Sequence, residues 1–466
     1  MNEDQRAQVR DNARYLRQVR PLDPDEISSY VDGTPHPAAI RQVLREEATD
    51  IGIVEREDGR FEPVDDEPVS VQFSGVETLP RPISRAFEDV LVEEVGPGWP
   101  DGTSGERLRA AIREFKHKYL AEESVTYDTV TALGYAIYHL PAYFAAVQYV
   151  LDELATDGLL ARQLRVLDIG AGTGGPALGL EEYLPDDALV EYHAVEPSAA
   201  ADVLEQLLET TGRNFHWQIH REQIESFEPG GNYDIILCAN VLSELDTPAA
   251  VLESTVDWLA SDGTVVALAP ADRNTATQLR SLERDIERRT DATVYGPTVR
   301  LWPDETPRSE SWSFTRKADV AVPPFQRRLA EHATDPEEFE NVDVQYAYSL
   351  LRTDGKRAIE FTPNPARVAK FGEMETHVTE RIDCVGIKLS HDLSDDGHPL
   401  FLLGDGSERI DHFAVLTDPS ALNRPLEEAA YGELLSLENV LVLWNDDEAA
   451  YNLVVDGESF VERLGR

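Results

Sequence analysis

The sequence predicts an α/β protein built on a parallel sheet with helices on both faces. Between residues 161 and 270, apolar stretches of strand length alternate with amphipathic stretches of helical period. One of the apolar stretches runs into a glycine-rich turn and then into a helix. Such alternation is typical of strands that lie parallel and are covered on both sides.

The expected elements follow in order along this region. The predicted strands end at or near Ile169, Val195, His220, Asn240 and Pro270. The predicted helices extend to about Tyr183 and then cover Ala199–Thr210 and the residues around Ala249–Ala260. In an open parallel sheet, ligands bind beyond the carboxyl ends of the strands, so the residues that follow each strand are the candidate site.

The first strand is followed by the pattern D-x-G-x-G-x-G, formed by Asp168, Gly170, Gly172 and Gly174. Glycines let the chain turn sharply and approach a ligand, and the free N–H groups of the next helix favour a polar or anionic group. Glu196 ends the next strand, where an acidic residue commonly binds ribose hydroxyls. A glycine-rich turn is also common in α/β proteins without a cofactor, so spacing alone leaves that alternative open.

This pattern resembles the class I S-adenosylmethionine-dependent methyltransferases and implies a Rossmann-like sheet with S-adenosylmethionine as the cofactor. The resemblance implies that Asp168 organises the loop and the methionine amino group, and that Glu196 binds the ribose. Gly170, Gly172 and Gly174 would approach the cofactor. Glu222 and Asn240 follow later strands at the same edge, where Glu222 or Gln223 is a candidate for the adenine.

Three further segments narrow the resemblance, namely residues 138–147, 240–245 and 346–352. Together they resemble a methyltransferase-like family that works on the ribosomal small subunit and includes mitochondrial assembly factors and archaeal relatives. The resemblance covers Glu106 to Thr353 and implies that the small ribosomal subunit or its rRNA is the partner in translation.

Those relatives carry a cysteine cluster for a metal site at a position that corresponds to about Tyr295–Phe325. This segment contains no cysteine, so we expect no metal there. We expect instead that the aromatic side chains of Trp302, Trp312, Phe314 and Phe325 pack to hold the insertion.

No catalytic residue can be assigned from the sequence. Base N-methylation often uses an Asn-Pro-Pro-Tyr-like turn, whereas this chain has Asn240-Val241-Leu242. Cys238 stands inside an apolar strand, where a thiol is expected to be inert. A non-catalytic factor that binds S-adenosylmethionine and assists ribosome assembly is therefore an alternative, and a small-molecule methyltransferase is a third.

The charge of the chain indicates a salty cytoplasm. The 42 basic and 88 acidic side chains give a net charge of −46 among 466 residues. Near 1 M salt the Debye length falls to about 3 Å, which removes most of the self-repulsion. A halophilic host is expected. The two cysteines suit a reducing compartment, and we expect neither a signal peptide nor an apolar run that spans a membrane.

The segment Arg273–Gly372 differs because its 16 basic and 16 acidic residues cancel. A surface that faces RNA phosphates and a set of internal ion pairs explain this balance equally well. The candidate RNA contacts are Arg284, Arg288, Arg316, Lys317, Arg327, Arg328, Lys356 and Arg357.

Modules with other patterns flank the predicted sheet. We expect a winged-helix-like module at 1–66 that begins with a polar arm to about Arg20, a linker at 67–105, a helical segment at 106–160, the cofactor-binding domain at 161–372 with an insertion at 291–340, and a β-rich OB-like barrel at 377–466. Pro141 is expected to divide the last helix of the helical segment. Tyrosines are interleaved along that helix, and such a stripe is more often core than a base-stacking surface.

Overall fold

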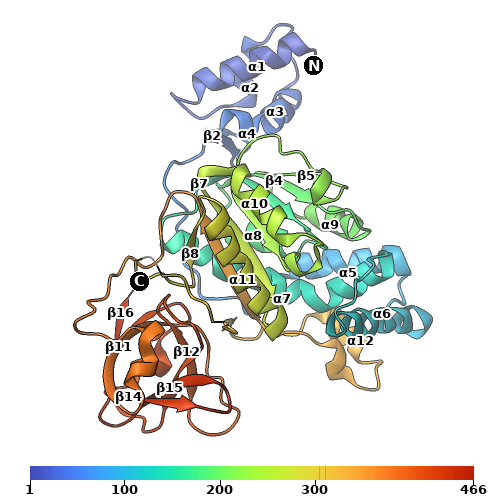
Figure 1. Ribbon diagram of the computed structural model, residues 1–466. Helices are drawn as coiled ribbons and strands as arrows, with labels where there is room; N and C mark the ends of the chain where they lie inside the picture. The colour runs from blue at the N-terminus through green and yellow to red at the C-terminus, as the bar shows by residue number, and fades with distance from the viewer. Residues whose placement is uncertain (304, 310, 466) are drawn as a thin grey trace. The chain divides into compact units, whose positions relative to one another are not determined.

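The computed structural model describes residues 1–303, 305–309 and 311–465 and shows an α/β protein with a separate β-barrel (Figure 1). The chain forms two compact units. The first comprises Met1–Ile236 and Ala318–Val344, and the second comprises Leu237–Lys317 and Gln345–Arg466. The boundary falls inside one strand, β6 (Tyr233–Ala239), and the second unit includes the barrel.

The first unit contains the parallel strands β3 (Gln163–Ile169), β4 (Leu189–Val195) and β5 (Phe215–His220), in the order β5-β4-β3-β6. Ile169 is in register with Val195, and Val195 is in register with His220. The carboxyl ends of the three strands therefore lie at one edge. The connecting helices are α8 (Gly175–Tyr183), α9 (Ala200–Leu208) and the short 3-10 turn η1 (Ile224–Ser226).

Helices before the sheet complete the first unit: α5 (Arg81–Val95), α6 (Gly102–Leu120) and α7 (Thr129–Thr156), with α12 (Pro324–Ala330) and the 3-10 turn η3 (Pro336–Phe339). α7 packs along α8 (Figure 1). Contrary to expectation, α7 is long and apolar enough to suit a membrane span, with a mean hydropathy of 1.2. Since 67% of its apolar window is buried within the protein, core packing accounts for that composition.

The prediction that Pro141 divides α7 is wrong, because the helix continues through it. Proline lacks the N–H that would bond the carbonyl four residues earlier, which here belongs to Ile137. The buried amide of Gln326 supplies the missing donor, with its Nε2 lying 2.8 Å from the Ile137 oxygen. A residue of α12 thus satisfies the group that the proline leaves unpaired.

Gln326→Leu is expected to destabilise the protein by about 2 kcal/mol, because it leaves the Ile137 carbonyl buried without a donor. Denaturant unfolding followed by circular dichroism measures this loss. Arg327→Leu is the matched control, since Arg327 is the exposed neighbour of Gln326 on the same helix. Equal stability of the two variants would contradict the role assigned to Gln326.

The N-terminal module has the helices α1 (Glu3–Leu16), α2 (Pro24–Tyr30), α3 (Pro37–Glu46) and α4 (Ala48–Ile51), followed by a hairpin of β1 (Ile53–Glu55) and β2 (Phe61–Pro63). Helices followed by a hairpin are the elements expected of a winged-helix-like module. The expected polar arm is instead helix α1. Asn2 and Gln5 form a capping box at its start, and Val9 and Ala13 are buried on its inner face.

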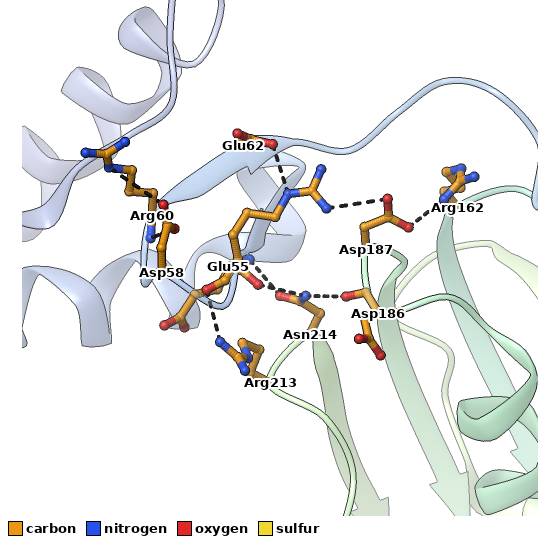
Figure 2. A network of polar contacts seen from close by, with 10 residues as sticks. Glu55, Asp58, Arg60, Glu62, Arg162, Asp186, Asp187, Arg213 and Asn214 are labelled. Carbon is orange, nitrogen blue, oxygen red and sulfur yellow. Dashed lines mark hydrogen bonds and ion pairs between the residues drawn. The ribbon is translucent and has the colours of Figure 1, made fainter.

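A polar network joins the hairpin to the amino-terminal edge of the sheet (Figure 2). The Asn214 side chain, just before β5, accepts the N–H of Glu55 at 2.8 Å. Its Nδ2 donates to the carbonyls of Glu55 at 3.2 Å and Asp186 at 2.9 Å. Arg56 lies 3.4 Å from Asp187, which also pairs with Arg162. One buried amide therefore fastens the module to the sheet on the edge away from the glycine turn.

Asn214→Ala is expected to weaken this attachment by about 3 kcal/mol, because the Glu55 N–H and the two carbonyls lose their partner. Limited proteolysis should then cleave near the hairpin faster than in the wild type. Arg213→Ala serves as the control, since exposed Arg213 makes one bond at 3.0 Å to the Arg56 carbonyl in the same network. Unchanged cleavage in Asn214→Ala would refute the prediction.

The second unit continues from β6 with β7 (Leu259–Pro270), β10 (Gln345–Arg352) and β8 (Thr293–Gly296), in the order β6-β7-β10-β8. β10 runs antiparallel to both β7 and β8, and the short β9 (Thr315–Arg316) also pairs with it. The helical elements of this part are η2 (Leu242–Glu244), α10 (Pro248–Trp258) and α11 (Arg273–Arg289).

The barrel follows a 3-10 segment, η4 (Phe371–His377), and consists of β11 (Arg381–Lys388), β12 (Leu400–Gly404), β13 (His412–Leu416), β14 (Leu434–Asn445) and β15 (Ala450–Val455), with β16 (Phe460–Gly465) added on β14. β11 pairs with both β12 and β14, which closes the barrel. β13 and β15 run parallel. The expected OB-like barrel is confirmed, and its interposed helix is the single turn α13 (Pro425–Glu428).

Three of the four aromatic residues expected to hold the insertion do so within the second unit. Trp302 donates from Nε1 to the buried Asp405 carboxylate at 2.6 Å. Trp312 donates to the Ala271 carbonyl at 2.8 Å and lies 5.3 Å, between ring centroids, from Phe314. Phe325 instead belongs to the first unit.

Candidate functional site

The site is built on the turn from β3 to α8. Gly170, Gly172 and Gly174 have φ values of +65°, +54° and +92°, which other residues rarely adopt. The Gly170 N–H donates to the Val195 carbonyl at 2.9 Å, so the turn is tied to the end of β4. Gly174 then caps α8, whose first turn contains Pro176. All three predicted glycines therefore lie at positions where the backbone has a positive φ.

Gly172 leaves space that a cofactor would require. A Cβ at this position would have the Gly170 carbonyl oxygen as its nearest neighbour, at 3.9 Å. At Gly174, by contrast, it would meet Leu204 at 2.8 Å. Gly174 is required for close packing of the turn, whereas Gly172 keeps the surface of the turn open.

Glu196 lies beside the turn. Its carboxylate accepts the Gly172 N–H at 2.9 Å and the Ser198 N–H at 2.9 Å. A carboxylate offers about four acceptor positions, so two remain for hydroxyl groups. The geometry suits a residue that holds ribose hydroxyls while it fixes the loop.

Asp168 is fully buried, and one of its two carboxylate oxygens accepts a hydrogen bond. Its Oδ2 accepts the Tyr192 hydroxyl at 2.5 Å, while its Oδ1 has no hydrogen-bond partner among the described residues. Burial raises the pKa of Asp168 to about 7, and the Glu196 charge adds to the rise. A buried carboxylate oxygen without a donor is the group that a ligand ammonium would satisfy.

Sequence reasoning missed Tyr192. Asp168 is in register with Ala194, and Tyr192 stands two residues before Ala194 on the same strand. Residues in this diagonal relation share a face of the sheet. This contact follows from the register between β3 and β4, and the residue spacing within either strand does not predict it.

Glu222 follows β5 at the same edge and is partly exposed. Its position at this edge suits the adenine role, and its charge also acts on His220. The structure brings Asp168, Gly170, Gly172, Gly174 and Glu196 together in the first unit, and Glu222 stands one strand further along.

Asn240 belongs to the second unit, where it follows β6. Its φ is +59°, and its N–H donates to the Leu268 carbonyl at 2.9 Å. The neighbouring cavity of about 10 Å³ has room for little more than one water molecule. Cys238, two residues earlier, is buried, as expected for an inert thiol.

The eight basic residues proposed to face RNA divide between the units. Arg327 and Arg328 lie in the first, and the other six lie in the second. Acidic side chains pair with three of them, Arg288, Arg328 and Lys356. Three more, Arg284, Arg327 and Arg357, donate to backbone carbonyls. Six of these eight side chains are therefore engaged in contacts within the protein.

The fold and the glycine turn define the class of protein. Residues 167–265 match the model of a methyltransferase domain, which confirms the predicted superfamily and the methyltransferase assignment. The same match supports S-adenosylmethionine as the cofactor.

Two further models match the ends of the chain. Residues 6–57 match the N-terminal domain, and residues 372–464 the C-terminal domain, of a domain of unknown function (DUF8157). These two matches cover parts of the N-terminal module and of the barrel.

Similar solved structures include methyltransferases. A putative methyltransferase from Thermoplasma acidophilum is 13% identical over 42% of this chain and 70% of its own, with a TM-score of 0.30. The plantazolicin methyltransferase BpumL in complex with SAH is 13% identical over 58% and 98%, with a TM-score of 0.29. The mitomycin 7-O-methyltransferase MmcR is 17% identical over 57% and 76%, with a TM-score of 0.24. No curated protein matches the chain.

Proposed function

We propose that this chain is a methyltransferase that binds S-adenosylmethionine along the turn from β3 to α8. One observation carries the proposal: open space at Gly172 lies beside the Glu196 carboxylate, with the unsatisfied Asp168 oxygen at the base of the same turn. Glu196 would hold the ribose, and Asp168 would balance the methionine ammonium. The bound cofactor would supply an electrophilic methyl group.

We propose further that the acceptor lies in the rRNA of the small ribosomal subunit. The resemblance of residues 138–147, 240–245 and 346–352 to the small-subunit family supports this proposal. A cavity of about 720 Å³ in the second unit is lined by Arg288, Arg300 and Arg357, whose guanidinium groups suit phosphates. Glu287, Glu305 and Glu360 line the same cavity and balance their charge, so the support for an RNA acceptor rests on the sequence resemblance.

A transfer assay with cofactor labelled in its methyl group tests this function. Purified small subunits and their free rRNA are incubated with the protein in high salt, and the RNA is then counted. We expect label in RNA with the wild type and none with Gly172→Arg. Absence of label despite measured cofactor binding would overturn the rRNA methyltransferase proposal.

The second candidate is a factor that binds the cofactor and the subunit without transferring the methyl group. It is favoured by the absence of an Asn-Pro-Pro-Tyr-like turn, since Asn240-Val241-Leu242 stands in its place. Co-sedimentation with small subunits without methyl transfer would identify this role. A small-molecule methyltransferase, which the internal ion pairs of the basic residues favour, would show neither co-sedimentation nor RNA labelling.

A further inference from the structure

A row of aromatic side chains begins at the cofactor turn. A Cβ built on Gly175, the first residue of α8, would lie 3.0 Å from the Cβ of Tyr143 and 3.4 Å from the Leu140 carbonyl oxygen. α7 therefore lies directly against the start of α8 at Tyr143. This contact places Tyr143 next to Gly175, the residue directly after the last glycine of the turn.

The other end of the row meets the loop after β4. The Ala199 N–H donates to the Tyr127 carbonyl at 3.3 Å, three residues beyond Glu196. Tyr127 and Tyr143 are thus fixed to the two loops that carry the ribose and glycine positions. A group that stacks on the tyrosines at these loops would lie beside the cofactor turn.

The rings between these ends form a continuous series. The ring centroids of Tyr127 and Tyr135 are 5.3 Å apart, and those of Tyr135 and His139 are 4.6 Å apart. His139 and Tyr143 stack at 4.9 Å with an interplanar angle of 13°. Four neighbouring rings thus link the two loops, with Tyr127 and Tyr135 in edge-to-face contact at 90°. We call Tyr127, Tyr135, His139 and Tyr143 the aromatic row.

The exposure of the row differs from that of a core. Tyr127, Tyr135 and Tyr143 are partly exposed, whereas Phe115, which contacts the Tyr135 ring, is only 4% exposed. Burial, with a smaller contribution from the Lys116 charge, lowers the pKa of His139 to about 3. His139 is therefore a neutral aromatic ring at neutral pH.

We propose that the aromatic row is the surface on which the methyl acceptor stacks, and that the acceptor group is a nucleobase. The inference rests on the proposed function, because it places the acceptor beside the cofactor turn. Nucleobases have two flat faces, and stacking on aromatic side chains contributes about 1–3 kcal/mol per base. An aliphatic acceptor would gain less from these partly exposed tyrosine rings.

Fluorescence of 2-aminopurine tests the inference, because its emission falls when the base stacks. A short single-stranded oligoribonucleotide with one 2-aminopurine is titrated with the protein in the presence of S-adenosylhomocysteine. We expect quenching with the wild type, and an affinity about 10-fold lower with Tyr135→Leu or Tyr143→Leu, as the loss of one stacked ring predicts. Tyr135→Phe and Tyr143→Phe should retain wild-type affinity, since the ring remains.

Controls separate this inference from the proposed function. Tyr15→Leu removes a tyrosine that is 74% exposed on α1 and should change nothing. Calorimetry with S-adenosylmethionine is run on every variant, and circular dichroism checks that each is folded. Cofactor binding without 2-aminopurine quenching, or quenching unchanged in Tyr135→Leu, contradicts the proposed role of the aromatic row and leaves the proposed function standing. Failure of the wild type to bind the cofactor overturns the proposed function instead.

A second arm distinguishes the source of the base. Free 2-aminopurine riboside is titrated in place of the oligonucleotide. Quenching only with the oligonucleotide supports a base held in RNA. Quenching of both with equal affinity supports the stacking surface and identifies a free nucleoside as a sufficient acceptor.

Discussion

Gly172→Arg is expected to lower the affinity for S-adenosylmethionine more than about 100-fold, equivalent to about 3 kcal/mol. The new side chain would start in the space that Gly172 leaves open and would extend across the turn. It would also bring a positive charge toward a cofactor that carries a sulfonium. Isothermal calorimetry in multimolar KCl measures the change directly.

The control for this variant is Gly158→Arg. Gly158 follows α7, has a φ of +68°, and has no atom within 4 Å of a built Cβ. Both substitutions therefore impose a similar backbone cost, about 1–2 kcal/mol for a left-handed residue other than glycine. Loss of cofactor binding in both variants would mean that backbone strain, and not occupation of the turn, causes the effect.

Asp168→Asn is expected to stabilise the cofactor-free protein and to weaken cofactor binding. Because the folded pKa of Asp168 is raised to about 7 from 3.8, the folded state holds the proton more tightly than the unfolded state. Stability is therefore unaffected below about pH 4 and falls as the pH rises toward 7. At about 1.4 kcal/mol per pH unit the loss reaches up to about 4 kcal/mol. Asparagine removes this loss while it still accepts the Tyr192 hydroxyl.

The measurement is a series of denaturant melts between pH 4 and pH 8 for both proteins. The stability of the wild type should fall across this range relative to that of Asp168→Asn. Cofactor affinity should show the opposite trend, since a ligand ammonium binds the ionised carboxylate, and wild-type binding should weaken below pH 7. Parallel pH profiles for the two proteins would show that Asp168 stays ionised without the cofactor.

Much of the candidate site was predictable because its signals are local. The glycines at 170, 172 and 174 stand at positions that require left-handed backbone, and Glu196 directly follows the next strand. Helix α1 also carries a local signal, the capping box of Asn2 and Gln5. Its polar composition nevertheless led to the prediction of an arm instead of a helix. A β-rich barrel was predictable from the C-terminal sequence, but strands β15 and β16 were not predicted, and closure depends on the pairing of β11 with β14.

The sequence by itself determined the α/β class, the turn that holds the cofactor and the acids beside it, because these features depend on spacing within a few residues. Only the tertiary structure decided the features that depend on distant partners. α7 stays intact at Pro141 because Gln326, 189 residues after Ile137, bonds its free carbonyl. Tyr192 reaches Asp168 because two strands adopt one register. The tyrosines of α7 had the pattern of a core stripe, and only their contacts with two loops placed them beside the cofactor turn.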